Sequence, residues 1–246
     1  MNQLLDIQIA KIDRKYIEIK ELGCAYGWRF LYTPKDTLMY PNGLMFLGLN
    51  PGGHGSAENT VESVENGNAY RVEYWKDQSK KLLNPLQKQV QAFFDLLAQS
   101  RLGERASHDS KRLMDETLTS NFCPFRSPSW AKFRPKEARD AAVAFSTDLW
   151  TEIIPKIKPR LILCMGSTQY SHLNGLLENI SSECGIEEHL PTGWGDIQFA
   201  IRQYKCAGRT TTLARIPHLS QYKLLNSPKY ADKMDAFIGK LANIAA

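Results

Sequence analysis

A buried strand that ends in a glycine-rich turn is the feature that most restricts how this chain can fold. Residues 43–53 read GLMFLGLNPGG, an unbroken apolar run followed by Asn50, Pro51 and two glycines. Continuous hydrophobicity is typical of a strand covered on both faces, as in parallel sheets, and proline and glycine end such a strand. Because the ligand loops of parallel sheets lie at the carboxyl ends of the strands, we expect Asn50 at the rim of a binding site. Asn-Pro is also a common turn former, so Asn50 alone does not identify a site.

Buried strands alternate with amphipathic helices along the chain, which predicts an α/β fold. The expected form is a three-layer α/β/α sandwich around a mostly parallel, four-stranded central sheet. Strands are predicted at about 44–49, 117–123, 161–165 and 210–216, the last as a hairpin with 196–205. Helices are predicted at about 3–20, from Pro85, from Pro135 and at the end of the chain. We expect one domain over 1–246, with the 3–20 helix packed on the sheet.

Residues 53–81 are polar, contain glycine and are too long for an ordinary connection. Such segments are usually lids, binding loops or disordered stretches, so we treat this one as a long loop insertion.

Composition favours a water-soluble protein. The 246 residues are 43% hydrophobic and 23% charged, and no apolar run approaches the roughly 20 residues that cross a bilayer. We therefore expect a cytoplasmic protein that does not contact membranes. A net charge of +5 permits attraction to nucleic acid but does not identify it. Five cysteines without any C-x-x-C spacing suggest neither a disulfide framework nor a metal site, and we expect no cofactor.

Two later segments have the same design as residues 43–53. Residues 119–126 read TSNFCPFR and residues 214–220 read ARIPHLS, and each ends a short strand-like run in a polar group. Together, GLNPG, NFCP and IPHLS resemble the motifs of the uracil-DNA glycosylase superfamily, most closely its single-strand-selective monofunctional branch and the bacterial relatives of that branch. Residues 158–166, KPRLILCMG, resemble the third core strand of the family. The resemblance covers about 43–220.

The resemblance implies an α/β/α architecture with a four-stranded core and a specific activity. Such an enzyme flips uracil or a related deaminated base out of DNA and hydrolyses its N-glycosidic bond without a covalent intermediate. We expect its partner to be DNA that contains uracil or another deaminated base, and we expect it to act as a monomer.

Roles for individual residues follow from the resemblance. Asn50 would position the hydrolytic water, and His218 would donate a hydrogen bond to the departing base. Asn121 can accept from N3–H of uracil and donate to O4, whereas cytosine presents the opposite polarity. The predicted base-binding residues are Gly48, Leu49, Pro51, Gly52, Asn121 and Phe122. The predicted DNA-binding residues are Gly53, Arg126, Ser220, Tyr222, Lys223 and Leu224, with Tyr222 or Leu224 as the wedge that fills the space left by the base.

The chain departs from the family pattern at two places. Leu219 stands where proline is usual in the His-Pro-Ser loop. Aligning Pro217 with that proline would instead put Ile216 at the histidine position and remove the donor. The long 53–81 loop also displaces the aromatic residue that normally stacks on the base soon after Asn-Pro-Gly. The possible substitutes are His54, Tyr70, Tyr74 and Trp75.

Two other functions stay open from the sequence. A superfamily member that has lost catalysis would bind nucleic acid or nucleotides without cleaving them. An unrelated hydrolase would pair His218 with a serine, but the G-x-S-x-G elbow is missing around Ser167.

Overall fold

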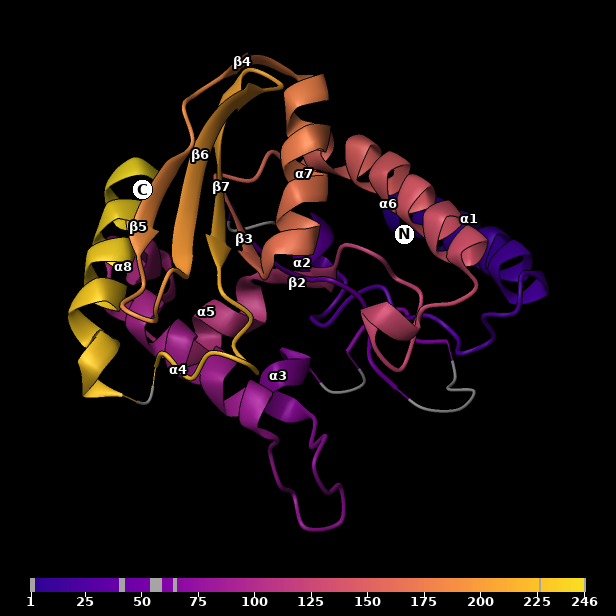
Figure 1. Ribbon diagram of the computed structural model, residues 1–246, viewed down its shortest axis with the longest axis horizontal. Coiled ribbons are helices and arrows are strands. Elements are labelled where there is room, and N and C mark those ends of the chain that lie inside the picture. Colours follow the sequence, from indigo (N-terminus) through magenta and orange to yellow (C-terminus); the bar gives the residue numbers. More distant parts are fainter. Residues whose placement is uncertain (1–2, 40–42, 54–58, 64–65, 226, 246) are drawn as a thin grey trace.

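The computed structural model describes residues 3–39, 43–53, 59–63, 66–225 and 227–245. Its centre is a mixed seven-stranded sheet (Figure 1). Four strands run parallel in the order β2 (Leu118–Asn121), β1 (Leu44–Gly48), β3 (Leu161–Met165) and β7 (Arg209–Ile216). The other three strands are antiparallel to their neighbours: β6 (Gln198–Cys206) pairs with β7, and both β4 (Ser181–Cys184) and β5 (Glu188–Pro191) pair with the other edge of β6.

The expectation of an α/β fold is confirmed, but the expectation of a four-stranded, mostly parallel sheet is wrong. The predicted hairpin forms as β6 and β7, and it extends the sheet in the antiparallel sense. Strands β4 and β5 read SSEC and EHLP, and most of their residues are exposed. These edge strands therefore lack the apolar pattern by which a buried strand is recognised.

Helices cover both faces of the sheet, because successive side chains of each buried strand point to opposite sides. Met45 and Leu47 of β1 face a core shared with α1 (Gln3–Glu21), α6 (Lys136–Ile157) and α7 (Ser167–Ile180). Leu44 and Phe46 face a second core. That core is shared with α3 (Ala69–Val72), α4 (Pro85–Gln99), α5 (Ser110–Glu116) and α8 (Ala231–Ala245). The short helix α2 (Asp36–Met39) and three 3₁₀ turns at Arg101–Ala106, Trp130–Lys132 and Pro228–Tyr230 complete the described elements.

Helix α1 spans nearly the residues predicted for it, but it packs along α6 rather than directly on the sheet (Figure 1). Lys11 of α1 forms an ion pair with Glu152 of α6, with Nζ 2.5 Å from Oε1. The apolar stripe of α1 thus completes the outer side of one core. Among the described residues, no helix is both long and apolar enough to cross a membrane.

Helix α4 starts where Pro85 predicts, and its first turn explains why. Asn84 accepts a hydrogen bond from the backbone N–H of Gln87, whose side chain bonds back to the backbone N–H of Asn84. This reciprocal cap satisfies two backbone donors that the helix cannot, and proline suits the first turn. The cap therefore fixes where α4 begins, directly after the segment 73–84.

Candidate active site

The loops that follow the four parallel strands line a cavity of about 800 Å³. This is the carboxyl edge of the parallel part of the sheet, where α/β proteins bind their ligands. The predicted site residues that line the cavity are Gly48, Leu49, Asn50, Gly52, Gly53, Asn121, Arg126, His218 and Ser220. Three segments that are far apart in the sequence therefore meet at one place.

Hydrogen bonds fix the orientation of the Asn50 amide. Its Nδ2 donates to Ser127 Oγ at 2.8 Å and to the Pro51 carbonyl at 3.1 Å, and it lies 3.4 Å from the Phe125 carbonyl. Ser127 Oγ donates its own proton to the Ser129 carbonyl, so it accepts from Asn50. The reversed amide would point Oδ1 at two carbonyl oxygens, which cannot donate. Asn50 Oδ1 bonds to none of the described residues and is free to accept from a ligand or a water.

Gly48 and Asn121 are register partners at the ends of β1 and β2. A Cβ atom at Gly48 would lie 2.2 Å from Asn121 Oδ1, which is much closer than real contacts allow. The missing side chain therefore lets the Asn121 amide lie across the end of β1. Asn121 is only 4% exposed, yet it lines the cavity. A ligand that failed to pair with this amide would leave buried polar groups unsatisfied, which is a strong basis for selectivity.

The tautomer of His218 follows from its contact with Ser220. The backbone N–H of Ser220 donates to His218 Nδ1 at 3.3 Å, and Ser220 Oγ lies 2.7 Å from the same nitrogen. A backbone N–H can only donate, so Nδ1 is the acceptor and the neutral ring carries its proton on Nε2. Burial lowers the pKa of His218, which favours this neutral form near pH 7. Nε2–H bonds to none of the described residues, so it remains a free donor beside the cavity.

The two alignments of the last motif differ clearly in the structure. Ile216 is fully buried at the end of β7 and belongs to the core that contains Phe46, whereas His218 lines the cavity. Leu219, which stands in place of the proline usual in the family, is 1% exposed and packs in the same core as Ile216. Only the alignment that keeps His218 places a polar side chain in the cavity.

Aromatic side chains form one wall of the cavity. Tyr32 and Tyr70 stack with ring centroids 5.8 Å apart, and Trp75 meets Tyr70 edge-on at 4.9 Å. Of the aromatic residues proposed to stack on a base, Tyr70 and Trp75 line the cavity and Tyr74 does not. His54 lies outside the described residues.

A buried ion pair supports this wall. Arg29 donates two hydrogen bonds to Glu73, at 2.8 and 2.6 Å, and its guanidinium lies 4.0 Å from the centroid of the Tyr32 ring. Trp75 Nε1 donates to the same carboxylate at 2.8 Å. The ion pair thus joins the segment before β1 to the segment after α3. Nothing in the sequence signals Arg29 or Tyr32, because the residues that hold them at the cavity, Glu73 and Tyr70, are dozens of residues away.

Arg126 is a second cation at the cavity, and it has no carboxylate partner among the described residues. Its Nη1 donates to the Gly52 carbonyl at 3.3 Å, and its buried Nε bonds to none of the described residues. Burial lowers the pKa of the guanidinium, but arginine stays charged in proteins. An anionic group that entered the cavity would give this cation the partner it lacks.

The N-terminus of α7 also opens on the cavity. Gly166 precedes the helix with φ at 118°, a left-handed conformation that favours glycine, and it provides no side-chain cap. Gly166, Ser167, Thr168 and Gln169 all line the cavity. The first N–H groups of a helix carry partial positive charge, so this wall favours a negatively charged ligand or leaving group.

Several predicted contacts are not made at the cavity. Phe122 follows Asn121 and therefore points to the other side of the sheet, where it is fully buried and stacks on His172 with centroids 5.0 Å apart. Pro51 is buried and does not line the cavity. We therefore correct the prediction that Phe122 and Pro51 touch a bound base through their side chains.

The segment after Ser220 also differs from expectation. Leu224 is 1% exposed in the core that holds α8, so it cannot be a wedge without leaving that core. Tyr222 is half-buried, meets Trp194 edge-on at 5.9 Å and does not line the large cavity. Lys223 lines a second, smaller cavity. Of the two wedge candidates, only Tyr222 stays near the surface.

The thiols and the Ser220–His218 contact offer no clear nucleophile. The five cysteines are free, and burial raises the pKa of Cys123 to about 12, which keeps that thiol protonated. Ser220 Oγ is within reach of His218, but Nδ1 also receives a backbone N–H, and no carboxylate of the described residues bonds to this histidine. Among the described residues, no group of three or more His, Cys, Asp or Glu side chains could hold a metal ion.

A comparison of the chain with models of known protein families found no match, and neither did a comparison with curated protein sequences.

Proposed function

We propose that the chain is a monofunctional DNA glycosylase that flips uracil or a related deaminated base into the 800 Å³ cavity and hydrolyses its N-glycosidic bond. The observation that carries this proposal is that Asn50, Asn121 and His218, from three separate motifs, line one cavity. Four strands of the seven-stranded sheet, β2, β1, β3 and β7, run parallel, and the loops after them line this cavity.

The orientation of Asn50 suits a water-positioning role. With Nδ2 bonded to protein oxygens, Oδ1 is left to accept a hydrogen bond from a water directed at C1′ of the sugar. An amide is a poor base, so it would act by placement and not by removing a proton. The water oxygen would bond to C1′ while the C1′–N bond breaks, and that electron pair would leave with the base. The water proton would be released, and the free base would take up a proton.

His218 and Asn121 would act on the departing base. The Nε2–H of neutral His218 would donate to the O2 on which negative charge develops, and the N-terminus of α7 would add positive potential. The Asn121 amide would accept from N3–H and donate to O4 of uracil. Tyr70 or Trp75 would stack on the base in place of Phe122. Arg126 would pair with a phosphate.

The one chain supplies all three motifs, and we therefore expect a monomer to be active. We also assign the protein to the cytoplasm, in keeping with its composition.

Incubation with oligonucleotides that carry one uracil, hypoxanthine or xanthine would test this function. We expect abasic sites, detected by alkaline strand cleavage, with at least one of these bases under single-turnover conditions, and none with the Asn50→Ala variant. Binding of a uracil-containing strand without an abasic product would instead support a non-catalytic binding protein. Labelling of Ser220 or Ser167 by a fluorophosphonate, without base release, would support the serine hydrolase alternative.

A further inference from the structure

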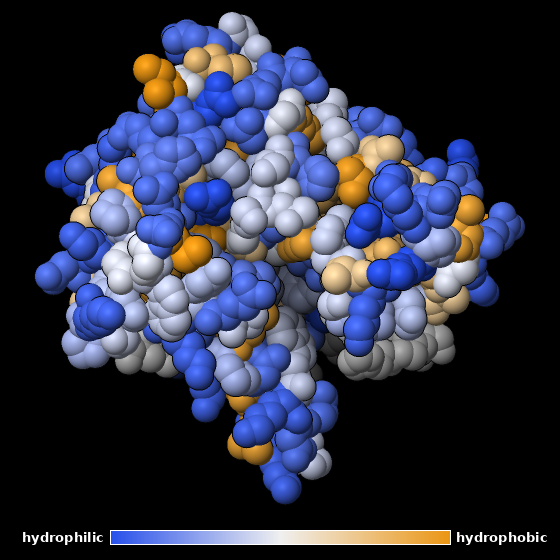
Figure 2. Space-filling model, viewed as in Figure 1, coloured by the Kyte–Doolittle hydropathy of each residue, from blue (hydrophilic) through white to orange (hydrophobic). Residues whose placement is uncertain are grey.

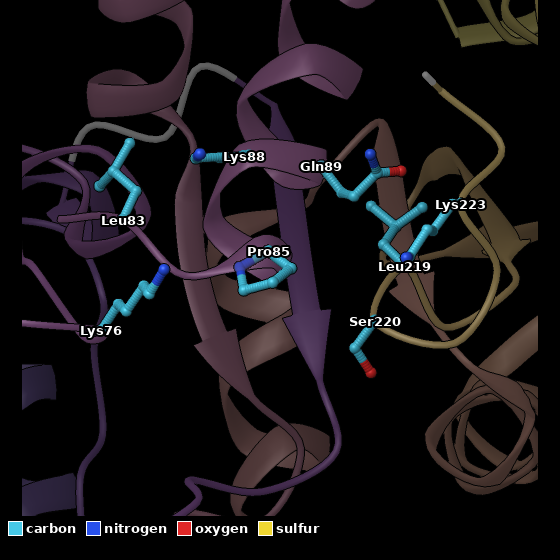
Figure 3. A pocket seen from close by; sticks show the side chains of 8 residues that line it. All are labelled: Lys76, Leu83, Pro85, Lys88, Gln89, Leu219, Ser220 and Lys223. Atoms are coloured by element: carbon cyan, nitrogen blue, oxygen red, sulfur yellow. The ribbon is translucent and has the colours of Figure 1, made fainter. Parts of the chain in front are cut away.

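A second cavity of about 210 Å³ adjoins the candidate active site, and Ser220 lines both. Its lining residues come from three elements: Lys76 and Leu83 from the segment 73–84, Pro85, Lys88 and Gln89 from α4, and Leu219, Ser220 and Lys223 from the loop after β7 (Figure 3). Three lysines thus surround a small depression next to the place where a base would enter. None of the lining residues is acidic.

The three lysines are available to a ligand. Lys76 and Lys88 are exposed, as is Lys223, and none of them forms an ion pair with a residue that the structure describes. The nearest acid in sequence, Asp77, forms its ion pair with Lys80, at 3.9 Å, and also accepts from Ser79 Oγ at 2.7 Å and from the Lys80 N–H at 3.0 Å. Most surface cations only keep a protein solvated, so a second observation is needed to infer a site.

Gln89 provides that observation. It is only 3% exposed, it lines the small cavity, and its buried Oε1 accepts no hydrogen bond from the described residues. A buried amide oxygen that accepts no hydrogen bond is rare, because leaving it unsatisfied costs free energy that a hydrogen bond would recover. Oε1 is an acceptor, as are the oxygens of a phosphodiester, so a bound phosphate would satisfy it through a bridging water that donates to both.

The segment 73–84 has the shape of an arm beside this cavity. Between α3 and α4 it projects from the molecule as a narrow hairpin (Figures 1 and 2). A backbone bridge between Asp77 and Leu82 holds the hairpin, and Lys81 at its turn adopts φ of 51°. Lys80 and Lys81 are exposed at its end; Lys80 pairs with Asp77 at 3.9 Å, and Lys81 extends the positive charge outward from Lys76.

We infer that this lysine-lined cavity and the arm bind the phosphodiester backbone of the DNA strand next to the flipped nucleotide. The inference rests on the proposed function for the identity of the strand. Ser220 lines both cavities, so a strand whose base enters the large cavity can carry a neighbouring phosphate past Ser220 into the small one. Point charges on flexible stems suit contacts to phosphates without regard to sequence, and such contacts determine affinity and salt dependence.

The test measures strand binding separately from base excision. The test variant is Lys76→Gln, Lys88→Gln and Lys223→Gln together. The matched control is Lys20→Gln, Lys111→Gln and Lys233→Gln, which removes the same charge from exposed lysines outside both cavities. Fluorescence anisotropy with a labelled single strand that contains thymine in place of uracil gives Kd from 50 to 300 mM salt. Each phosphate contact on a single strand contributes about 0.7 to the slope of log K against log salt, so we expect the test variant to lose about two from that slope. Its affinity at 50 mM salt should fall on the order of 100-fold, against less than about threefold for the control.

A second experiment changes the DNA, so that its main measurement uses the parent protein and does not depend on the folding of a variant. Neutral methylphosphonates placed one at a time near the nucleotide that enters the cavity should weaken binding by the parent protein at one or two positions. The same positions should have little effect on the test variant, because the charges they would meet have been removed. Equal slopes for the test and control variants, or no sensitive position in the parent protein, would overturn the inference.

The two proposals fail differently. Lysine-dependent strand binding without excision of any base would reject the glycosylase function and leave the strand-binding surface in place. Excision of uracil by a protein whose strand binding ignores the three lysines would reject the surface and leave the function.

Discussion

Asn121 Oδ1 occupies the space that a Cβ atom at Gly48 would fill, since the two positions would be 2.2 Å apart. The register of β1 and β2 brings these residues together, so the absence of a side chain at one strand end sets the position of a polar side chain at the next. Gly48 is not in a left-handed conformation, and its requirement for glycine is therefore one of space alone.

Gly48→Ala should move the Asn121 amide out of the cavity. We expect single-turnover excision of uracil to fall about 100-fold or more, because a small displacement of a positioning group has a large effect on rate. The measurement is rate at saturating enzyme, with thermal unfolding alongside. Gly175→Ala in α7, where an added Cβ meets nothing within 4 Å, is the control and should keep the parent rate. A fully active Gly48→Ala enzyme would remove Asn121 from base recognition.

Asn50 and Ser127 should act as a unit. Asn50→Ala should lower cleavage by orders of magnitude while binding to a non-cleavable uracil analogue changes only several-fold. Ser127→Ala removes the 2.8 Å acceptor but leaves the Pro51 carbonyl, so we expect a smaller loss of about tenfold. The double variant should be no slower than Asn50→Ala alone. Additive losses would show that Ser127 acts independently of Asn50.

Substitution of His218 should lower the rate of excision, whereas substitution of Ile216 should lower the stability of the fold. His218→Ala should slow the chemical step about 100-fold or more, through loss of a donor to the leaving base, and should change unfolding little. Ile216→Ala should lower the free energy of unfolding by about 2–5 kcal/mol through loss of a buried side chain. Its rate per folded molecule should stay near that of the parent. Denaturant unfolding and single-turnover kinetics on both variants separate the two cases.

The pH dependence should reflect a neutral His218. Burial lowers its pKa below the ordinary 6.5, so the rate should be level from about pH 6.5 to 8. Below pH 6.5 the unfolded chain binds a proton at this histidine before the folded protein does, and stability should therefore decrease as pH falls from that value. Both effects should be reduced in His218→Ala. A rate that depends on His218 and changes with a midpoint above pH 6.5 would show that the cationic form matters.

The sequence predicts the buried strands and their loops well, because continuous apolar runs and Asn-Pro-Gly turns are local signals. It also predicts the cavity positions of Asn50, Asn121 and His218. It does not predict β4 and β5, which are polar edge strands held by backbone pairing to β6. The NFCP motif predicts Phe122 at the site, but alternation continues past the end of β2 and turns Phe122 into the core. The sequence does not signal Arg29 and Tyr32, because the contacts that bring them to the cavity are tertiary.

The ion pair between Arg29 and Glu73 has a consequence for how the site is assembled. Burying two charges costs roughly as much free energy as their attraction returns, so this pair is not expected to add much stability. The pair instead links the formation of the aromatic wall to two distant parts of the chain. Tyr32 packs against Arg29 and Trp75 bonds to Glu73, so both rings reach their positions only when both parts have folded. Replacement of both charged residues by apolar ones of similar size should leave the melting temperature nearly unchanged and still yield an ill-defined pocket. Thermal stability would then be a poor guide to whether the pocket is correctly formed.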